Sequence, residues 1–199
     1  MKLTDLDKLL NSELTTKIKN SFIENDELLI KVDIENLNSV LLFLKTDNKC
    51  SFKQLVDIVA VDYPNNDKRF QICYLLLSHK NNFRIKVSVV LSSEERVASI
   101  TKIYPSANWM EREIFVMYVI KFKNHPDLRR ILTDYNFKGF PLRKDFPLTG
   151  FNEVRYSEKD KKVIYEPVKL EQDYRDFDFD SPWEGTKYIK NIKRGNKDG

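Results

Sequence analysis

The sequence predicts an α+β fold, with a mixed sheet of about four strands and flanking helices, followed by an extended, largely irregular C-terminal arm. Before residue 136, short apolar segments of strand length alternate with amphipathic segments of helical spacing. From Phe137 onward, prolines recur and the apolar spacing is irregular, which indicates a segment that lies along another surface. We therefore divide the chain into an α/β globular domain at 1–135, a partner-wrapping arm at 136–183 and a basic tail at 184–199.

The N-terminal part predicts a helix, a strand and a second helix. A stripe of apolar residues at three- or four-residue spacing predicts an amphipathic helix over residues 3–22; the stripe consists of Leu3, Leu6, Leu10, Leu14, Ile18 and Phe22. Residues 27–34 then alternate between apolar and polar side chains, as in a strand with one solvated face. Helical spacing returns over residues 37–44, with Asn36 or Asn38 as the N-cap.

Three further strands complete the predicted sheet. Residues 55–63 are rich in β-branched side chains and are closed by a proline and two asparagines, which mark a turn. Residues 70–78 and 83–91 are two more apolar segments of strand length. The connection between them is short and asparagine-rich, which favours a β-hairpin.

Helix-start signals follow this sheet. Ser92 with Glu95 has the spacing of a capping box and predicts a short helix through Ile100. Asn108 with Glu111 predicts a second helix. Its latter half, residues 114–120, is apolar throughout and could instead be a buried strand, but the preceding cap favours a helix.

Two weaker elements are expected further along the chain. The sequence DLRRIL at 127–132 predicts a helix that begins after His125, for which we expect a local capping and packing role. In the arm, residues 163–168 predict a single strand.

The composition argues against several functional classes. The net charge is 34 − 30 = +4, but residues 184–199 contribute about +3 of it, so the body is nearly neutral and differs from a dedicated nucleic-acid-binding domain. No apolar run approaches the ~18 residues of a membrane span. Cys50 and Cys73 lack the spacing of metal ligands and are interpreted as reduced thiols. With two histidines and no phosphate-binding motif, the chain is expected to hold no cofactor, no metal and no catalytic residue.

The strongest functional signal is a dense mixture of charged and aromatic residues between positions 111 and 145. Aromatic side chains and arginine are typical of interface hot spots, because they combine a large buried area with planar hydrogen-bonding groups. The segment therefore predicts a docking surface. Its candidate partner-contacting residues are Glu111, Arg112, Glu113, His125, Asp127, Arg129, Arg130, Arg143, Lys144 and Asp145.

Within this region, NHPDLRRILTDYNFKGFPLRKDFPLTG (124–150) resembles the signature of the 30-kDa subunit family of respiratory complex I, which includes a bacterial NADH-quinone oxidoreductase subunit and the mitochondrially encoded NADH dehydrogenase subunit 9. Colinear similarity extends from about residue 55 to 183, through DIVAVDYP, IYPSANWMERE, EVRY, VIYEPV and FDFDSPW. The chain departs from the family pattern at Val116 and Val119, which replace an acid and a glycine, at Asn136, which replaces a glycine, and at Phe140, which replaces a histidine.

This resemblance implies a non-catalytic accessory subunit in the peripheral arm of proton-translocating NADH:ubiquinone oxidoreductase. It implies that the arm wraps the quinone-binding (49-kDa) subunit and that the chain holds neither flavin nor iron–sulfur cluster. The expected location is the matrix side of the mitochondrial inner membrane or the bacterial cytoplasmic side, with the membrane contacted only through the complex. Two alternatives remain: an equivalent subunit of a complex I-related membrane-bound hydrogenase, and an RNA- or ribosome-associated basic protein.

Overall fold

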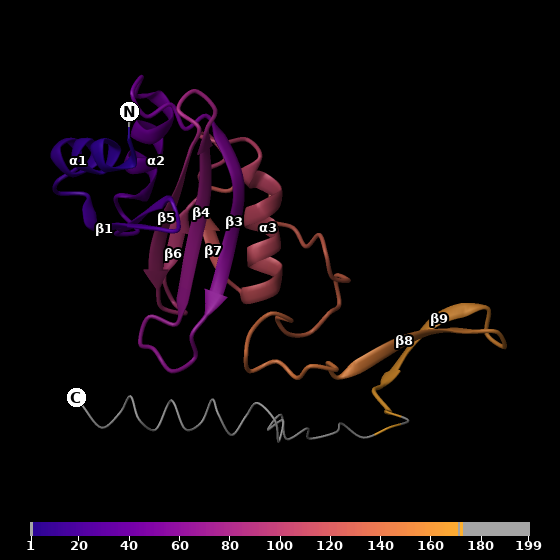
Figure 1. Ribbon diagram of the computed structural model, residues 1–199. Coiled ribbons are helices and arrows are strands. Elements are labelled where there is room, and N and C mark those ends of the chain that lie inside the picture. Colours follow the sequence, from indigo (N-terminus) through magenta and orange to yellow (C-terminus); the bar gives the residue numbers. More distant parts are fainter. Residues whose placement is uncertain (1, 171, 173–199) are drawn as a thin grey trace, which may run out of the picture. The chain divides into compact units, whose positions relative to one another are not determined.

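The structure is a computed structural model that describes residues 2–170 and 172. Contacts within the chain divide it into two units, a body that ends at Gly150 and a second unit that begins at Phe151 (Figure 1). The predicted basic tail lies outside the described residues.

A five-stranded sheet forms the centre of the body. Its strands are β1 (Ile18–Glu24), β2 (Glu27–Val32), β3 (Gln54–Asp62), β4 (Phe70–Ser78) and β5 (Phe83–Leu91), in the order β1-β2-β5-β4-β3. The β2–β5 pair is parallel and the other neighbours are antiparallel. The predicted mixed sheet is therefore confirmed, and β4 and β5 have the predicted bounds.

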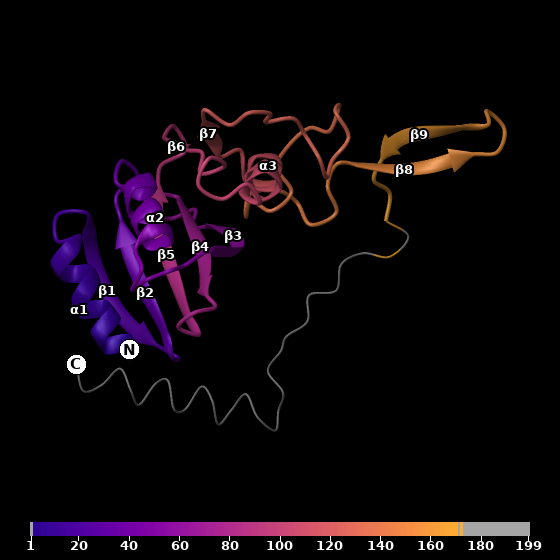
Figure 2. The same ribbon diagram turned by 90° about the horizontal axis from the view of Figure 1, so that it is seen from above.

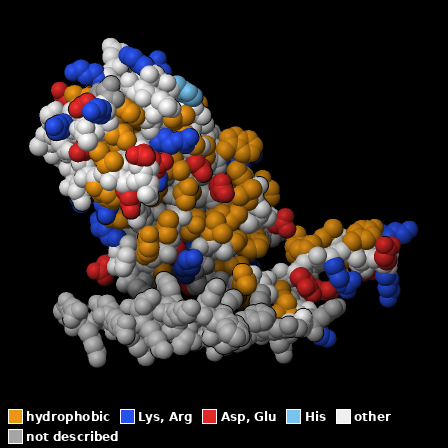
Figure 3. All heavy atoms as spheres, viewed as in Figure 1, with side chains coloured by type: hydrophobic (Ala, Val, Ile, Leu, Met, Phe, Trp, Pro, Cys, Tyr) orange, Lys and Arg blue, Asp and Glu red, His pale blue; other side chains and the backbone are white. Residues whose placement is uncertain are grey.

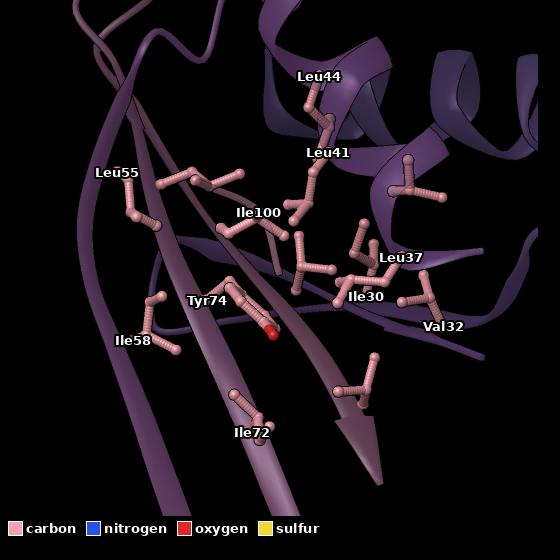
Figure 4. Close-up of a cluster of buried hydrophobic side chains, with 14 of the residues drawn as sticks. Ile30, Val32, Leu37, Leu41, Leu44, Leu55, Ile58, Ile72, Tyr74 and Ile100 are labelled. Atoms are coloured by element: carbon pink, nitrogen blue, oxygen red, sulfur yellow. The ribbon is translucent and has the colours of Figure 1, made fainter. Parts of the chain in front are cut away.

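The helices bury one face of this sheet. Helices α2 (Leu37–Thr46) and α3 (Ala107–Tyr118) lie on the same side of it, while α1 (Leu3–Glu13) lies near β1 (Figure 2). Every second side chain of β4 is buried, as the two-residue period of a strand requires when one face packs against helices. In Figure 4, Leu37 of α2 lies beside Ile30 of the sheet, and Leu41 lies beside Ile100. The core thus sits between the helices and this face.

The N-terminal helix is shorter than predicted. It ends at Glu13, and the predicted continuation to residue 22 is wrong because residues 18–24 form β1. A spacing of four residues places two side chains on one face of either a helix or a strand. Ile18 and Phe22 therefore fit the helical stripe in sequence but pair with β2 in the sheet.

The helix predicted after Ser92 is also wrong. The backbone N–H of Ser92 does donate to the Glu95 carboxylate at 2.7 Å, but no helix follows. Residues 96–98 instead form β6 (Arg96–Ala98), which pairs in parallel with β7 (Lys121–Lys123). Pairing of the buried Val97 with the distant, buried Phe122 overrides the local helix signal.

In the second unit, β8 (Asn152–Ser157) and β9 (Lys162–Pro167) form an antiparallel hairpin. The strand predicted at 163–168 is thereby confirmed within one residue at each end. Its pairing with residues 152–157 was not predicted. We call residues 152–167 the hairpin.

Candidate partner-binding surface

The predicted docking segment is anchored to the body by a buried carboxylate. Asp62 is the last residue of β3, on the same inward face as Ile58 and Ala60, and is 3% exposed. Arg69, just before β4, binds it through two parallel hydrogen bonds, from Nε at 2.6 Å and Nη2 at 2.8 Å. These bonds hold the pKa of the Asp62 carboxyl below its usual range. The turn between β3 and β4 therefore carries a fixed ion pair.

The loop around residues 143–145 joins this ion pair. The backbone N–H of Lys144 donates to Asp62 Oδ2 at 2.8 Å. Asp145 lies 3.0 Å from Arg69 Nη1 and accepts two hydrogen bonds from Arg143, at 3.1 and 2.8 Å. Hydrogen bonds from Arg143 and Arg69 lower the pKa of Asp145 to about 2. We call Asp62, Arg69, Arg143 and Asp145 the charge latch; its two acids and two arginines balance.

Aromatic rings pack around the latch and shape its loop. The guanidinium groups of Arg69 and Arg143 lie over the Phe70 ring, at 5.3 and 5.9 Å from its centroid. Phe146 packs on Phe137, with 5.9 Å between the ring centroids. Gly139 has φ +108°, and a Cβ built there would lie 2.5 Å from the Phe146 ring. Only glycine fits this approach.

The segment after β7 is held by α3 and is not the helix that DLRRIL predicted. Arg112 of α3 donates from Nε to the carbonyl of Arg129 at 2.9 Å and from Nη2 to that of Arg130 at 3.4 Å. These carbonyls are thus bonded to a side chain, and residues 127–132 are not helical. Arg112 also stacks on Trp109, 5.6 Å from the ring centroid, and the Trp109 side chain is 67% exposed.

Helix α3 itself begins at Ala107, so the predicted helix is confirmed over most of its length, but its predicted cap is not formed. The N-cap residue is Ser106, without a side-chain capping bond. Glu111, the expected partner of Asn108 in a capping signal, is completely buried and bonds to Ser99 and Ile100 instead. The buried strand considered for residues 114–120 is excluded, because α3 extends to Tyr118.

The predicted contact residues therefore fall into four groups. Arg143 and Asp145 belong to the charge latch, and Arg112, Asp127, Arg129 and Arg130 order the segment after β7, where Arg129 pairs with Asp127 at 2.7 Å. Glu111 and His125 are buried. Glu113 and Lys144 are exposed. That these residues contact a partner stays a prediction; Asp62 and Arg69 were missed, although a charge at an inward-facing position of an apolar strand is a readable signal.

The hairpin, within the predicted partner-wrapping arm, carries a second exposed surface. Cross-strand pairing places Val154 opposite Tyr165, and Tyr156 opposite Val163, on one face. These four side chains are 55 to 61% exposed. The other face carries the Arg155–Glu166 ion pair at 2.5 Å. An isolated two-stranded hairpin is marginally stable in water, so an apolar face of this kind points to a covering surface.

The body has its own exposed apolar positions. Side chains of β3 and β5 such as Val59 and Val90 are about 40% exposed, and hydrophobic side chains gather on the face of the body seen in Figure 3. None of the helices in the described part of the chain has the length and hydropathy of a membrane span. Among the described residues, no three His, Cys, Asp or Glu side chains gather as metal ligands would.

Comparison with known proteins identifies a family. A sequence model described as "Respiratory-chain NADH dehydrogenase, 30 Kd subunit" matches residues 30–152. A subunit of the NADH-quinone oxidoreductase of Mesorhizobium japonicum is 49% identical over 187 residues, covering 94% of this chain and 93% of that protein. The corresponding NADH-quinone oxidoreductase protein of Ruegeria pomeroyi is 56% identical over 163 residues, covering 82% of each chain.

Two solved structures are similar. One is the trypsin-resistant fragment (1-134) of Nqo5, with a TM-score of 0.54 and 26% identity, covering 62% of this chain and 98% of that one. The other belongs to the membrane-bound sulfane sulfur reductase, an archaeal respiratory membrane complex, with a TM-score of 0.65 and 21% identity, covering 86% of this chain and 98% of that one. The second likeness shows a shared fold.

Proposed function

The chain belongs to the 30-kDa subunit family of respiratory-chain NADH dehydrogenase, and from this premise we propose that it is a non-catalytic assembly subunit in the peripheral arm of proton-translocating NADH:ubiquinone oxidoreductase. Its task is to bind and stabilise the quinone-binding (49-kDa) subunit through the arm. The chain supports electron transfer from NADH to quinone without holding a redox centre itself. It reaches the membrane only through the complex, on the matrix side in a mitochondrion or the cytoplasmic side in a bacterium.

The exposed Tyr and Val face of the hairpin is the observation that carries this proposal. If a partner covered on the order of 100 Å² on each of its four side chains, the gross gain at ~25 cal/mol per Å² would be about 10 kcal/mol. Ordering of the strands offsets part of this gain, at ~1–2 kcal/mol per residue. The balance favours a hairpin that is already paired, as here, over a disordered segment that must fold on binding.

The arrangement of charges supports a structural role over catalysis. The charge latch joins two acids and two arginines, and Arg112 is directed at backbone carbonyls. Such contacts fix the shape of a surface. The one described carboxyl that burial moves toward a catalytic pKa, Glu111, is fully enclosed, without exposed surface for a substrate.

The test compares two adjacent residues on opposite faces of the hairpin. Tyr156→Ser removes an aromatic side chain from the apolar face, and Arg155→Ser makes the same final residue on the other face. Each is expressed in cells that lack the wild-type protein, and the fraction of the protein that migrates with the large membrane complex on a native gel is measured.

Loss of an interface hot spot of ~2 kcal/mol weakens binding about 30-fold. Tyr156→Ser is therefore expected to reduce the amount of assembled complex, and Arg155→Ser to leave it near the wild-type amount. Equal assembly of both variants would contradict the proposal, as would normal assembly with lost turnover per complex.

Protease resistance provides a second test. The similar Nqo5 structure is of a trypsin-resistant fragment, which supports the expectation that trypsin cuts this chain after the body. The isolated protein should lose the part of the arm that follows Gly150 early and retain the body, whereas the assembled complex should protect that part of the arm. Equal resistance of arm and body in the isolated chain would show that the arm does not need a partner.

A further inference from the structure

Glu111 is a carboxyl group enclosed between three segments of the body. It lies on α3 and is 0% exposed. Its Oε1 accepts the backbone N–H of Ile100 at 2.8 Å, and its Oε2 lies 2.7 Å from the Ser99 hydroxyl. On its third side, His125 Nε2, from the segment after β7, is 3.8 Å from Oε2. Both loop segments therefore meet at this one side chain.

No positive charge balances this carboxylate among the described residues. His125 is the candidate counter-charge, but its Nδ1 accepts the backbone N–H of Asp127 at 3.0 Å, so Nε2 carries the ring proton. That Nε2–H donates to the carbonyl of Asn108 at 3.1 Å. Arg112, the next residue along α3, is directed at the carbonyls of Arg129 and Arg130.

From the sheet side, the neighbouring titratable group is a tyrosine. Tyr74 of β4 is completely buried, and burial and the nearby Glu111 both raise the pKa of its phenol. It therefore stays neutral and supplies no charge to Glu111. An uncompensated buried carboxylate is unfavourable, and such a group takes up a proton.

A chain of hydroxyls joins the carboxyl to the surface. Ser99 Oγ lies 2.9 Å from Thr101 Oγ1, and Thr101 is partly exposed. Each hydroxyl can donate in either direction. With Glu111 ionised, Ser99 donates to it; with Glu111 protonated, Glu111 can donate to Ser99 and Ser99 to Thr101. The network thus accommodates both states and gives the proton a route to solvent.

We propose that Glu111 is a proton-binding site, and that the bound proton locks the segments after β6 and after β7 onto α3. Loss of the proton leaves an enclosed negative charge with no counter-charge, which loosens both segments. The second of them carries Arg129 and Arg130 at the predicted docking surface. The site is therefore a means by which pH acts on that surface, but its existence does not depend on the proposed function.

The sign of the pH effect follows from the environment. Burial raises the pKa of Glu111 from 4.5 to about 7, against the opposing effect of the hydrogen bonds from Ile100 and Ser99. The folded protein therefore binds more protons than the unfolded chain between these two values. Stability contributed by this proton is fully present below pH 4.5 and is lost as the pH rises through about 7.

The experiment measures urea unfolding of the purified full chain from pH 5 to pH 8 for the wild type, Glu111→Gln and Glu113→Gln. Glutamine has the size of a protonated glutamate and cannot ionise, and Glu113 is an exposed control two residues away. The unfolding constant of the wild type, relative to Glu111→Gln, is expected to rise about 10- to 100-fold across this range, since one unit of pKa is a tenfold change. Glu113→Gln should follow the wild type. Parallel pH profiles of the wild type and Glu111→Gln would overturn the proposal.

Two further measurements apply even if Glu111→Gln folds poorly. In wild-type protein labelled with carboxyl-¹³C glutamate, one carboxyl resonance is expected to titrate far above the others, near pH 7; titration of every glutamate below pH 5.5 would overturn the proposal.

Trypsin cleavage after Arg129 and Arg130 reports on whether the segment after β7 is held on α3. It should accelerate from pH 6 to pH 8 in the wild type more than in a reference peptide of the same sequence, and equal acceleration would refute the lock.

Discussion

The body and the hairpin each contain a tyrosine paired with a valine across antiparallel strands. In the body, Tyr74 of β4 pairs with Val87 of β5, and both are 0% exposed. In the hairpin, Tyr156 pairs with Val163, and each is 56% exposed. The local chemistry is the same, because aromatic and β-branched residues favour strand pairing in either setting. What differs is the presence of helices over one pair.

The two units therefore obtain their stability from different sources. The body completes its own core by placing α2 and α3 over the sheet. The hairpin is a separate sheet of two strands, and the side chains of its Tyr and Val face are more than half exposed. A substitution in the body should therefore appear in the unfolding of the isolated chain. The same substitution in the hairpin should appear only in assembly.

The largest expected difference in stability is between one ion pair of the body, Asp62–Arg69, and one of the hairpin, Arg155–Glu166. Asp62→Ala leaves Arg69 beside an empty, buried site, and removal of one partner of a buried pair costs roughly 3–5 kcal/mol. Arg69 retains Asp145 and some solvent contact, so we expect a loss of about 3 kcal/mol in the free energy of urea unfolding. Glu166→Ala breaks the solvated pair with Arg155 and should cost less than about 1 kcal/mol. Similar losses would show that the latch does not stabilise the body.

The next comparison uses two valines. Val87→Thr places a hydroxyl in the core without a change of shape, and burying it unpaired costs about 1–3 kcal/mol. Val163→Thr exposes the same hydroxyl to water and is expected to stay within ~0.5 kcal/mol of the wild type. Thermal and urea unfolding of the isolated protein measure both. A loss of stability in Val163→Thr comparable to that in Val87→Thr would mean that the hairpin face packs within the chain.

The sequence predicted the fold well where periodicity and length agreed. Strands β4 and β5 are apolar segments of strand length joined by a short asparagine-rich turn, and their bounds were predicted without error. Failures came where a distant contact decided the structure. The Ser92 N–H does bond to Glu95, yet Val97 pairs with Phe122 in a buried parallel bridge and the helix does not form. The sequence pattern around Val97 does not indicate that it pairs with Phe122.

The candidate site was predicted in location but not in arrangement. The density of arginine and aromatic residues indicated the segment up to Asp145, but the latch also needs Asp62 and Arg69, far earlier in the chain. Glu111 was expected at a surface because charged residues are mostly exposed; its burial depends on Ser99 and Ile100, which β6 brings to α3. Contacts between distant segments decided both outcomes.

The smallest expected effect is also the one whose sign is most informative. The Tyr74 hydroxyl is buried and has no hydrogen-bond partner among the described residues. An unsatisfied buried polar group costs ~1–3 kcal/mol, and Tyr74→Phe removes it while keeping the ring that fills the core. The small cavity left by the oxygen offsets part of the gain. We therefore expect Tyr74→Phe to raise the free energy of unfolding by about 1 kcal/mol, whereas Tyr156→Phe in the exposed hairpin pair should change it by less than ~0.5 kcal/mol. Urea unfolding of both variants at pH 6 measures the difference. A loss of stability in Tyr74→Phe would show that its hydroxyl makes a favourable bond, and the buried pair would then differ from the exposed one in hydrogen bonding as well as in burial.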